Sequence, residues 1–193
     1  MLWLAEALAQ VGEFGAVLRA ITRIGPAFAP PLFDMFREQR EFRLDLVATN
    51  GTEIRFDQLL GQKATAHMGL ADELRRHFSG ICSRVSEGHR DATFTYYRLE
   101  IVPQFWLLKL RSQSRIFQQL SVPDILKKVL TGLEVEYSLQ GQYEKREYCV
   151  QYRETDFDFA SRLMEEEGIF YFFKHTQNSH KLVITDSALN YPD

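Results

Sequence analysis

Three consecutive acids, Glu165 to Glu167, are the residues whose type and spacing come nearest to supporting chemistry. Paired carboxylates can act as a general acid and base, or bind a hard cation. Neighbouring residues on a helix, however, point about 100° apart, so these three carboxylates do not converge on one ligand. The pattern favours solvated or interface charges, and an acid site in an enzyme is the less favoured alternative.

The histidines give no recognised metal-binding pattern. They are His67, His77, His89, His175 and His180. None belongs to an HExxH motif or another recognised ligand spacing, although His175 and His180 flank a short loop and could meet across it. The sequence also contains no GxSxG elbow, P-loop or GxGxxG motif. We therefore expect no catalytic residue, no metal site and no cofactor.

The two cysteines, Cys82 and Cys149, are too few and too far apart for a disulfide framework or a CxxC zinc site. Both lie in strand-like runs, where a buried free thiol is expected.

Two aromatic pairs, Tyr96-Tyr97 and Phe105-Trp106, could stack on a sugar or a base. The net charge of −3 supplies no broad basic surface to neutralise phosphates, so nucleic-acid binding is disfavoured. Core packing or contact with another subunit is the stronger interpretation of these aromatic residues.

The composition is that of a folded protein, with 193 residues, 45% hydrophobic and 25% charged. The apolar N-terminus carries Glu6 and Glu13 and no basic residues ahead of them, unlike a signal peptide. No uncharged apolar run approaches the roughly 20 residues that span a bilayer. We expect no membrane-spanning segment, and a chain made and kept in the cytoplasm unless a machine exports it.

The elements expected in the first half are mostly short strands. Residues 1–14 have a weak helical pattern, and a strand followed by an irregular loop is expected over residues 16–31. Further strands are expected at 42–47, 63–68, 77–85 and 92–102. Asn50-Gly51 predicts a type I′ hairpin turn with a return strand at 53–56. Strands at such regular intervals indicate a small barrel or sandwich.

After residue 110 the hydrophobic period becomes helical. Ser121 and Asp124 form a capping box, and Gly132 ends the helix that they begin. The predicted buried stripe of this helix comprises Val122, Ile125, Leu126, Val129, Leu130 and Leu133.

Thr155 and Asp158 form a second capping box, and Gly168 ends that helix. Its predicted buried stripe comprises Phe159, Ala160, Leu163 and Met164. Residues 169–174 and 181–185 should then pair as a hairpin.

The sequence therefore predicts an α+β fold in which an antiparallel β-barrel-like subdomain precedes a helix-plus-strand subdomain. The expected division is an unassigned N-terminal extension at 1–15, the barrel-like subdomain at 16–110 and the helix-plus-strand subdomain at 111–193.

The segment 143–174, which reads as strand, capped helix, glycine stop and strand, resembles the VgrG family of type VI secretion spike proteins. In that family the segment belongs to the hub module shared with contractile phage tails. Other stretches resemble the family in the same order: 78–81, 97–108, 115–118 and 121–126. The resemblance runs from about Phe42 to Asp186 and implies a phage tail hub-like fold.

The resemblance implies a structural hub component with no catalysis of its own. It implies a homotrimer whose barrels form a pseudo-six-fold ring on the hexameric tube protein, and effector or adaptor proteins as further partners. Such a protein would be secreted by the type VI machine as part of a complete spike. The chain stops at Asp193, short of the complete hub module. The alternative is therefore a truncated adaptor that binds an effector or an intact spike subunit.

Overall fold

The computed structural model describes residues 6–11, 18–21, 42–51, 54–69, 75–176 and 179–190. The chain forms two compact units. The first comprises residues 1–103 with 175–180, and the second comprises residues 104–174 with 181–193.

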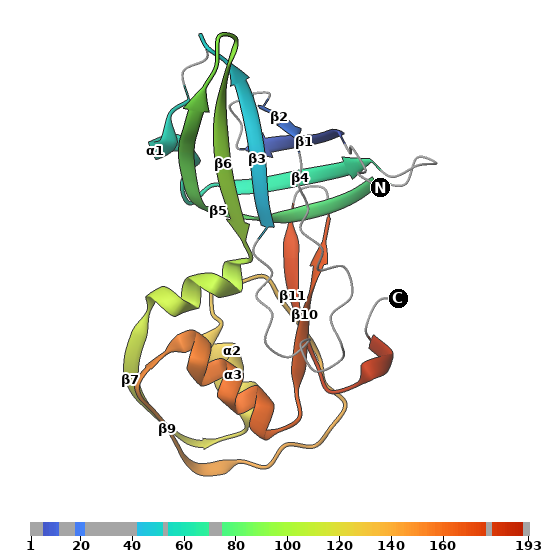
Figure 1. Ribbon diagram of the computed structural model, residues 1–193. Helices are drawn as coiled ribbons and strands as arrows, with labels where there is room; N and C mark the ends of the chain where they lie inside the picture. Colours follow the sequence, from blue (N-terminus) through green and yellow to red (C-terminus); the bar gives the residue numbers. More distant parts are fainter. Residues whose placement is uncertain are drawn as a thin grey trace. The chain divides into compact units, whose positions relative to one another are not determined.

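The first unit contains a closed barrel with the strand order β1-β2-β3-β6-β5-β4 (Figure 1). The strands are β1 (Glu6–Val11), β2 (Leu18–Ile21), β3 (Phe42–Thr49), β4 (Lys63–Gly69), β5 (Arg75–Arg90) and β6 (Phe94–Val102). Every adjacent pair described in register is antiparallel. A short helix, α1 (Phe56–Leu59), lies between β3 and β4. The predicted antiparallel barrel is therefore confirmed.

The barrel core follows from alternation along β3 and β6. Leu44 and Leu46 on β3, and Tyr97, Leu99 and Ile101 on β6, are buried. This is the period of two that a strand with one buried face requires.

Gly80 on β5 marks a close approach of two backbones. A Cβ at this position would lie 2.5 Å from the carbonyl oxygen of Val102 on β6. Glycine at position 80 is thus a packing requirement, because only glycine lacks the atom that would clash.

Charged side chains form ion pairs on the outer face of strands β3, β5 and β6. Arg43 and Arg84 lie 3.6 and 3.7 Å from the carboxylate of Glu100. Arg98 donates to Asp45 at 2.9 Å. Opposite charges placed across neighbouring strands in this way stabilise the sheet.

The second unit contains two separate small sheets, the α-helices α2 and α3, and two 3₁₀ helices (Figure 1). Its strands are β7 (Ser112–Leu120), β8 (Val135–Ser138), β9 (Arg146–Thr155), β10 (Phe170–His175) and β11 (His180–Thr185). Its helices are η2 (Gln104–Leu110), α2 (Val122–Val129), α3 (Asp156–Glu166) and η3 (Ala188–Asn190). One sheet has the order β10-β11-β8, and β7 pairs with β9 in a two-stranded ribbon.

Helices α2 and α3 supply the core of the second unit, and both predicted stripes are confirmed except at Leu133, which lies beyond the end of α2 and is only partly buried. The residues with the lowest exposure include Val122, Ile125, Leu126, Val129, Phe159, Ala160 and Leu163. Phe117 of β7 stacks on Phe159 with ring centroids 5.6 Å apart, and Cys149 of β9 joins the same cluster. One face of the ribbon thus closes over the helices.

The glycine stops are confirmed. Gly132 and Gly168 follow α2 and α3 with φ of 93° and 68°, in the left-handed region that glycine adopts without a steric cost.

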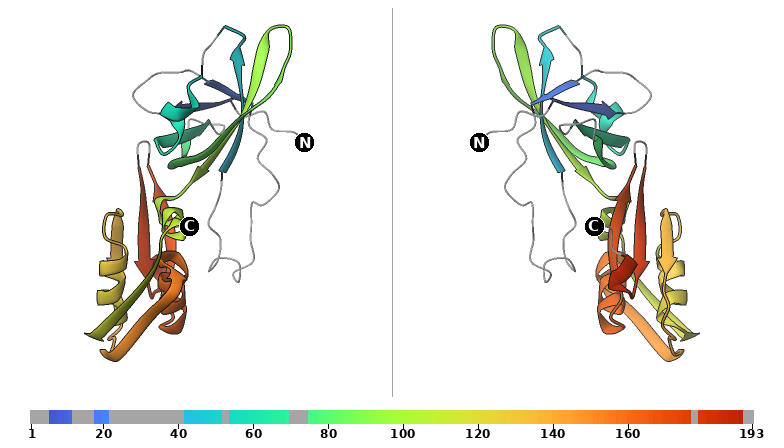
Figure 2. Two further views of the ribbon diagram at one scale, coloured as in Figure 1. Left: turned by 90° about the vertical axis from the view of Figure 1, so that its left-hand side faces the viewer. Right: turned by 90° about the vertical axis from the view of Figure 1, so that its right-hand side faces the viewer.

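The hairpin predicted at Asn50-Gly51 is wrong. β3 pairs with β2 and β6, and the chain enters α1 at Phe56 instead of returning as a strand. Asn50 donates to the carbonyl oxygen of Asp91 at 2.8 Å and accepts from Arg90. The end of β3 and the β5–β6 turn therefore lie side by side, as Figures 1 and 2 show.

The weak helical pattern at residues 1–14 is also wrong where the structure describes that segment. Glu6–Val11 is a strand that pairs with β2 and β4. Its pairing with both neighbours closes the barrel, which a local periodicity does not reveal. The loop predicted after β2 falls mainly on residues 22–31, which lie outside the described residues.

Candidate interaction surface

The β7–β9 ribbon presents an uncharged outer face. Ile116 lies opposite Val150, and Gln118 lies opposite Tyr148, in an antiparallel register. The outward-facing residues are Ser114, Ile116, Gln118, Tyr148, Val150 and Tyr152, and all of them are exposed. At the border of the face, the guanidinium of Arg153 lies 5.3 Å from the centre of the Tyr152 ring.

The apolar members of this face are unusually open to solvent. Ile116 is 68% exposed, Tyr148 61%, Val150 47% and Tyr152 66%. Contiguous exposed apolar side chains on a sheet mark an interaction surface more often than isolated ones do. A two-stranded ribbon is also only marginally stable without further packing.

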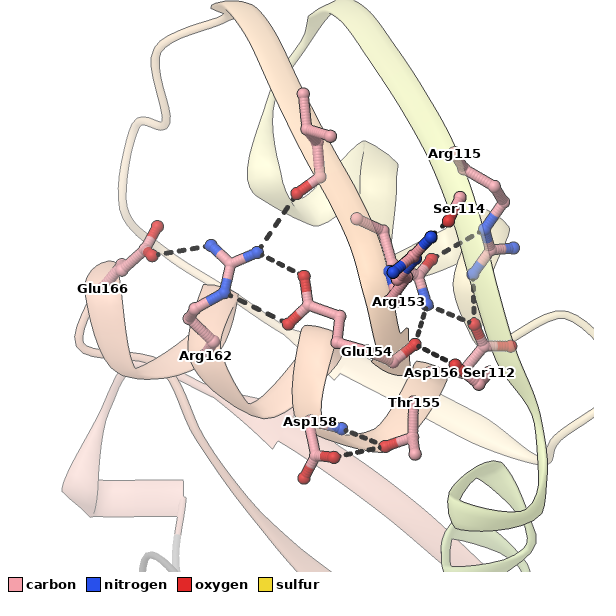
Figure 3. Close-up of polar contacts among 12 residues, drawn as sticks. Ser112, Ser114, Arg115, Arg153, Glu154, Thr155, Asp156, Asp158, Arg162 and Glu166 are labelled. Atoms are coloured by element: carbon pink, nitrogen blue, oxygen red, sulfur yellow. Dashed lines mark hydrogen bonds and ion pairs between the residues drawn. The ribbon is translucent and has the colours of Figure 1, made fainter.

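A buried carboxylate fixes the ribbon from its inner side (Figure 3). Asp156, the first residue of α3, is fully buried. It accepts from Arg115 at 2.5 Å and from Gln151 at 2.8 Å, and it pairs with Arg111. This cluster of Arg111, Arg115, Gln151 and Asp156 is called the polar lock below.

Gln151 completes the polar lock. Its side-chain oxygen accepts from Arg115 Nε at 2.8 Å, and its amide nitrogen donates to the carbonyl oxygen of Glu154 at 3.1 Å. Gln151 is fully buried and has partners on both ends of its amide, which removes the cost of an unpaired buried polar group. The polar lock thereby ties β7, β9 and α3 together.

The start of α3 is capped as predicted. Thr155 Oγ1 accepts from the backbone N–H of Asp158 at 3.0 Å (Figure 3). The equivalent contact at α2 differs, because Ser121 donates its hydroxyl to the Asp124 carboxylate at 2.7 Å and caps no backbone N–H. A side chain therefore caps a backbone N–H at α3 but not at α2.

The acids at Glu165–Glu167 lie at the end of α3 among arginines. Arg146 reaches Glu166 at 2.5 Å and Glu167 at 2.6 Å, while Arg162 bridges Glu166 at 3.0 Å and Glu154 at 2.7 Å. Burial raises the pKa of Glu166, but the bonds from Arg146 and Arg162 outweigh this and the pKa lies below its ordinary value. An ionised, arginine-paired carboxylate is a poor general acid at neutral pH.

The histidines are distributed over separate places. His67 on β4 and His77 on β5 are register neighbours, and the His89 ring stacks on Tyr96 with centroids 4.0 Å apart. The rings of His175 and His180 are 6.2 Å apart, and within the first unit His175 Nδ1 accepts from the backbone N–H of Ser79 at 3.1 Å. Over the described ranges no group of three or more His, Cys, Asp or Glu residues is placed to hold a metal ion.

The predicted buried thiols are confirmed. Cys82 and Cys149 are free and buried, in different units. Burial raises the pKa of the Cys82 thiol to about 11, which leaves it protonated at neutral pH.

The aromatic pairs mostly serve packing. Tyr97 lies in the barrel core and meets Phe56 edge to face, with centroids 6.2 Å apart. Phe105 is buried between Phe157 and Tyr171, at 4.8 and 4.9 Å. The core-packing interpretation of these residues is confirmed.

A carboxylate clamp holds a loop of the second unit. Asp186 accepts from the backbone N–H groups of Gln140 at 3.0 Å and Gly141 at 2.7 Å, and from the hydroxyl of Tyr143 at 2.8 Å. The Gly141 bond is the largest of the effects that lower the pKa of Asp186. Beside this loop lies a hollow of about 330 Å³, lined in part by Lys127.

The whole sequence predicts no membrane-spanning segment. For the segments that the structure describes, no helix has the length and apolar character to cross a bilayer.

Sequence reasoning missed both faces of the ribbon. Tyr148, Val150 and Tyr152 recur at every second position, which is the signal that places them on one face. Nothing local marks Asp156 as buried, because its arginine partners lie 45 and 41 residues earlier in the chain.

Comparison with known proteins gives one family. The family described as phage tail baseplate hub (GPD) matches residues 36–193. The type VI secretion system spike protein VgrG1b of Pseudomonas aeruginosa is 45% identical over 149 residues, which are 76% of this chain and 20% of that protein. The chain thus spans about a fifth of the length of this curated relative.

Solved structures share the fold. The E. coli c3393 protein, a type VI secretion component with structural similarity to the T4 bacteriophage tail proteins gp27 and gp5, matches with a TM-score of 0.69 and 26% identity. That match covers 80% of this chain and 45% of the other. A Francisella PdpA–VgrG complex matches at a TM-score of 0.53 and 12% identity, over 96% of this chain and 28% of the other.

Proposed function

The chain belongs to the phage tail baseplate hub (GPD) family, and we propose that it is a structural hub component of a type VI secretion spike. In this proposal it forms a homotrimer, seats on the hexameric tube protein and performs no catalysis of its own. It is made in the cytoplasm and leaves the cell as part of the spike that the machine exports. The subdomain boundary near residue 110 stays part of the proposal. The extension predicted at 1–15 is wrong where the structure describes it, because β1 (Glu6–Val11) is a strand of the barrel.

The observation that carries the proposal is the 45% identity to VgrG1b over 149 residues. The geometry agrees with an assembly role. The carboxylates that could have formed an acid site are held by Arg146 and Arg162, and the ribbon presents an apolar face to solvent. A protein that works by shape needs such contact surfaces rather than tuned titrating groups.

The test is to mix the purified chain with purified tube protein of the same secretion system and measure masses by analytical ultracentrifugation. We expect the chain alone to reach three times its 22.5 kDa mass, and three chains to bind one tube hexamer. The mass of a single chain at all concentrations, with no binding to the tube protein, would overturn the proposal.

A second candidate is an adaptor that binds an effector or an intact spike subunit. It is supported by the fold shared with a Francisella PdpA–VgrG complex, in which VgrG is bound to another protein. Capture of a full-length spike subunit by the immobilised chain, in the absence of any homotrimer, would select the adaptor.

A further inference from the structure

We infer that the outer face of the β7–β9 ribbon is the surface on which a second copy of this chain packs. The inference rests on the proposed function, because it names the surface that the proposed homotrimer would use. It is argued from the ribbon itself, in four steps.

The first step is the direction of the side chains on β9. The strand turns Gln151 inward, where it is fully buried, and turns Tyr148, Val150 and Tyr152 outward. A ribbon that only had to cover its own helices would place its large apolar residues inward and its polar residues outward. Phe117 and Cys149 point inward onto the helices, but three further large side chains of β9 point outward, so the outer face is built to be covered as well.

The second step is the size of the face. A large side chain presents about 150–250 Å² of surface, so the exposed parts of Ile116, Tyr148, Val150 and Tyr152 add to roughly 500 Å². A stable interface takes about 800 Å² from each partner. The four side chains therefore make up more than half of one side of a standard interface.

The third step is charge, which selects the occupant. A quarter of the residues in the chain are charged, yet none of the six outward residues of the ribbon is. A surface that meets another copy of its own chain must avoid bringing like charges together, and a neutral face does this at any rotation about the contact. A partner with a strong opposite charge would instead be matched by a charged face.

The fourth step is rigidity. The polar lock holds both strands of the ribbon against α3 through Asp156, which is fully buried. A face fixed in advance loses little conformational freedom when it is covered, which favours association.

The test compares variants by size-exclusion light scattering over a range of concentrations. Val150→Glu and Ile116→Glu place a charge on opposite strands of the face. Leu110→Glu is the matched control, because Leu110 is 71% exposed and lies in η2, outside the ribbon. Circular dichroism confirms that each variant is folded, which is expected since all three side chains face solvent.

We expect the unchanged chain and Leu110→Glu to reach the same multiple of the chain mass. Both ribbon variants should require at least about tenfold higher concentration, the shift that corresponds to about 1.4 kcal/mol. Equal masses for all four proteins would overturn the inference and leave the proposed homotrimer standing on another surface. Equal loss in the control and the ribbon variants would also overturn it, as would the mass of a single chain for the unchanged protein.

The other occupant to distinguish is the remaining polypeptide of a hub module. Mixing the chain with the hub region of VgrG1b that follows the matched segment tests it. If the chain is monomeric alone, binds this polypeptide, and loses that binding in Val150→Glu, the face belongs to the polypeptide. That result would overturn the inference that a second copy of the chain packs there.

Discussion

The barrel sheet and the ribbon are built from the same antiparallel pairing, but they treat their outer faces in opposite ways. On β3 and β6 of the barrel, Asp45 pairs with Arg98 and Arg43 approaches Glu100 across the strands. The outer face of strands β7 and β9 instead carries uncharged side chains, such as the cross-strand neighbours Ile116 and Val150. The barrel face carries paired charges, whereas the ribbon face is uncharged and exposes apolar side chains.

The inner faces of the barrel and of the ribbon also differ. The barrel interior is apolar along β6, with Leu99 and Ile101 fully buried. The ribbon interior contains a buried ion cluster around Asp156 in addition to Phe117 and Cys149. Buried ion pairs add little net stability compared with apolar packing, but they specify one arrangement when every group is satisfied. The polar lock therefore positions the ribbon more than it strengthens the core.

The largest loss of stability is expected from Asp156→Asn, which removes the buried carboxylate on the inner side of the ribbon. The change leaves Arg111 and Arg115 without their carboxylate partner, and breaking a buried pair costs about 3 kcal/mol of unfolding free energy. The measurement is the urea midpoint at constant m-value. Asp45→Asn is the matched control in the exposed barrel pair, where the loss should stay under about 1 kcal/mol. Equal losses in both variants would contradict the account.

Gly80→Ala should produce the next largest effect, and it tests the barrel instead of the ribbon. The added Cβ would lie 2.5 Å from the Val102 carbonyl oxygen, so strands β5 and β6 must move apart. We expect a loss of about 2 kcal/mol, as for other overpacked sites. Gly51→Ala is the control, because nothing lies within 4 Å of a Cβ there and its φ is not positive. A Gly80→Ala variant as stable as Gly51→Ala would show that the barrel is looser than described.

Thr155→Ala tests the helix cap at the junction of β9 and α3. It removes the hydroxyl that accepts from the Asp158 N–H, which should cost about 1 kcal/mol. Ser121→Ala should cost less, because Ser121 caps no backbone N–H of α2. Thermal unfolding of the two variants ranks the caps. A larger loss at Ser121 would contradict the assignment of the side-chain cap to α3.

The smallest effect on stability is expected at Asp186, whose carboxylate holds a loop outside the ribbon. This contribution to stability should depend on pH. The pKa of Asp186 is lowered in the folded protein, so the contribution is present above the ordinary value of 3.8 and is lost as pH falls through the lowered value. We expect the stability difference between the wild type and Asp186→Asn to be largest near neutral pH and to shrink below about pH 4. Unfolding curves from pH 7 to pH 2.5 measure it. A difference that grows on acidification would reverse the sign and refute the clamp.

The sequence predicted the elements that local chemistry determines. Thr155 with Asp158, and the glycines at 132 and 168, placed both long helices of the second unit because capping and left-handed backbone are local requirements. The barrel strands followed from alternation with a period of two.

What the sequence could not predict depends on distant partners. Asn50 has the local chemistry of a hairpin turn, but its side chain bonds to the β5–β6 turn about 40 residues away. Asp156 has the chemistry of an exposed acid in the first turn of a helix, but the fold buries it against Arg111 and Arg115. The open face of the ribbon was visible only as alternation, because the direction of each side chain is set by packing against α2 and α3.

The most direct test of the central claim is hydrogen–deuterium exchange of the unchanged chain at low and at high protein concentration. The account predicts that peptides covering β7 and β9 become more protected at high concentration, while peptides covering β3 and β6 exchange at the same rate. Protection that appears on the barrel strands and leaves the ribbon unchanged would contradict it.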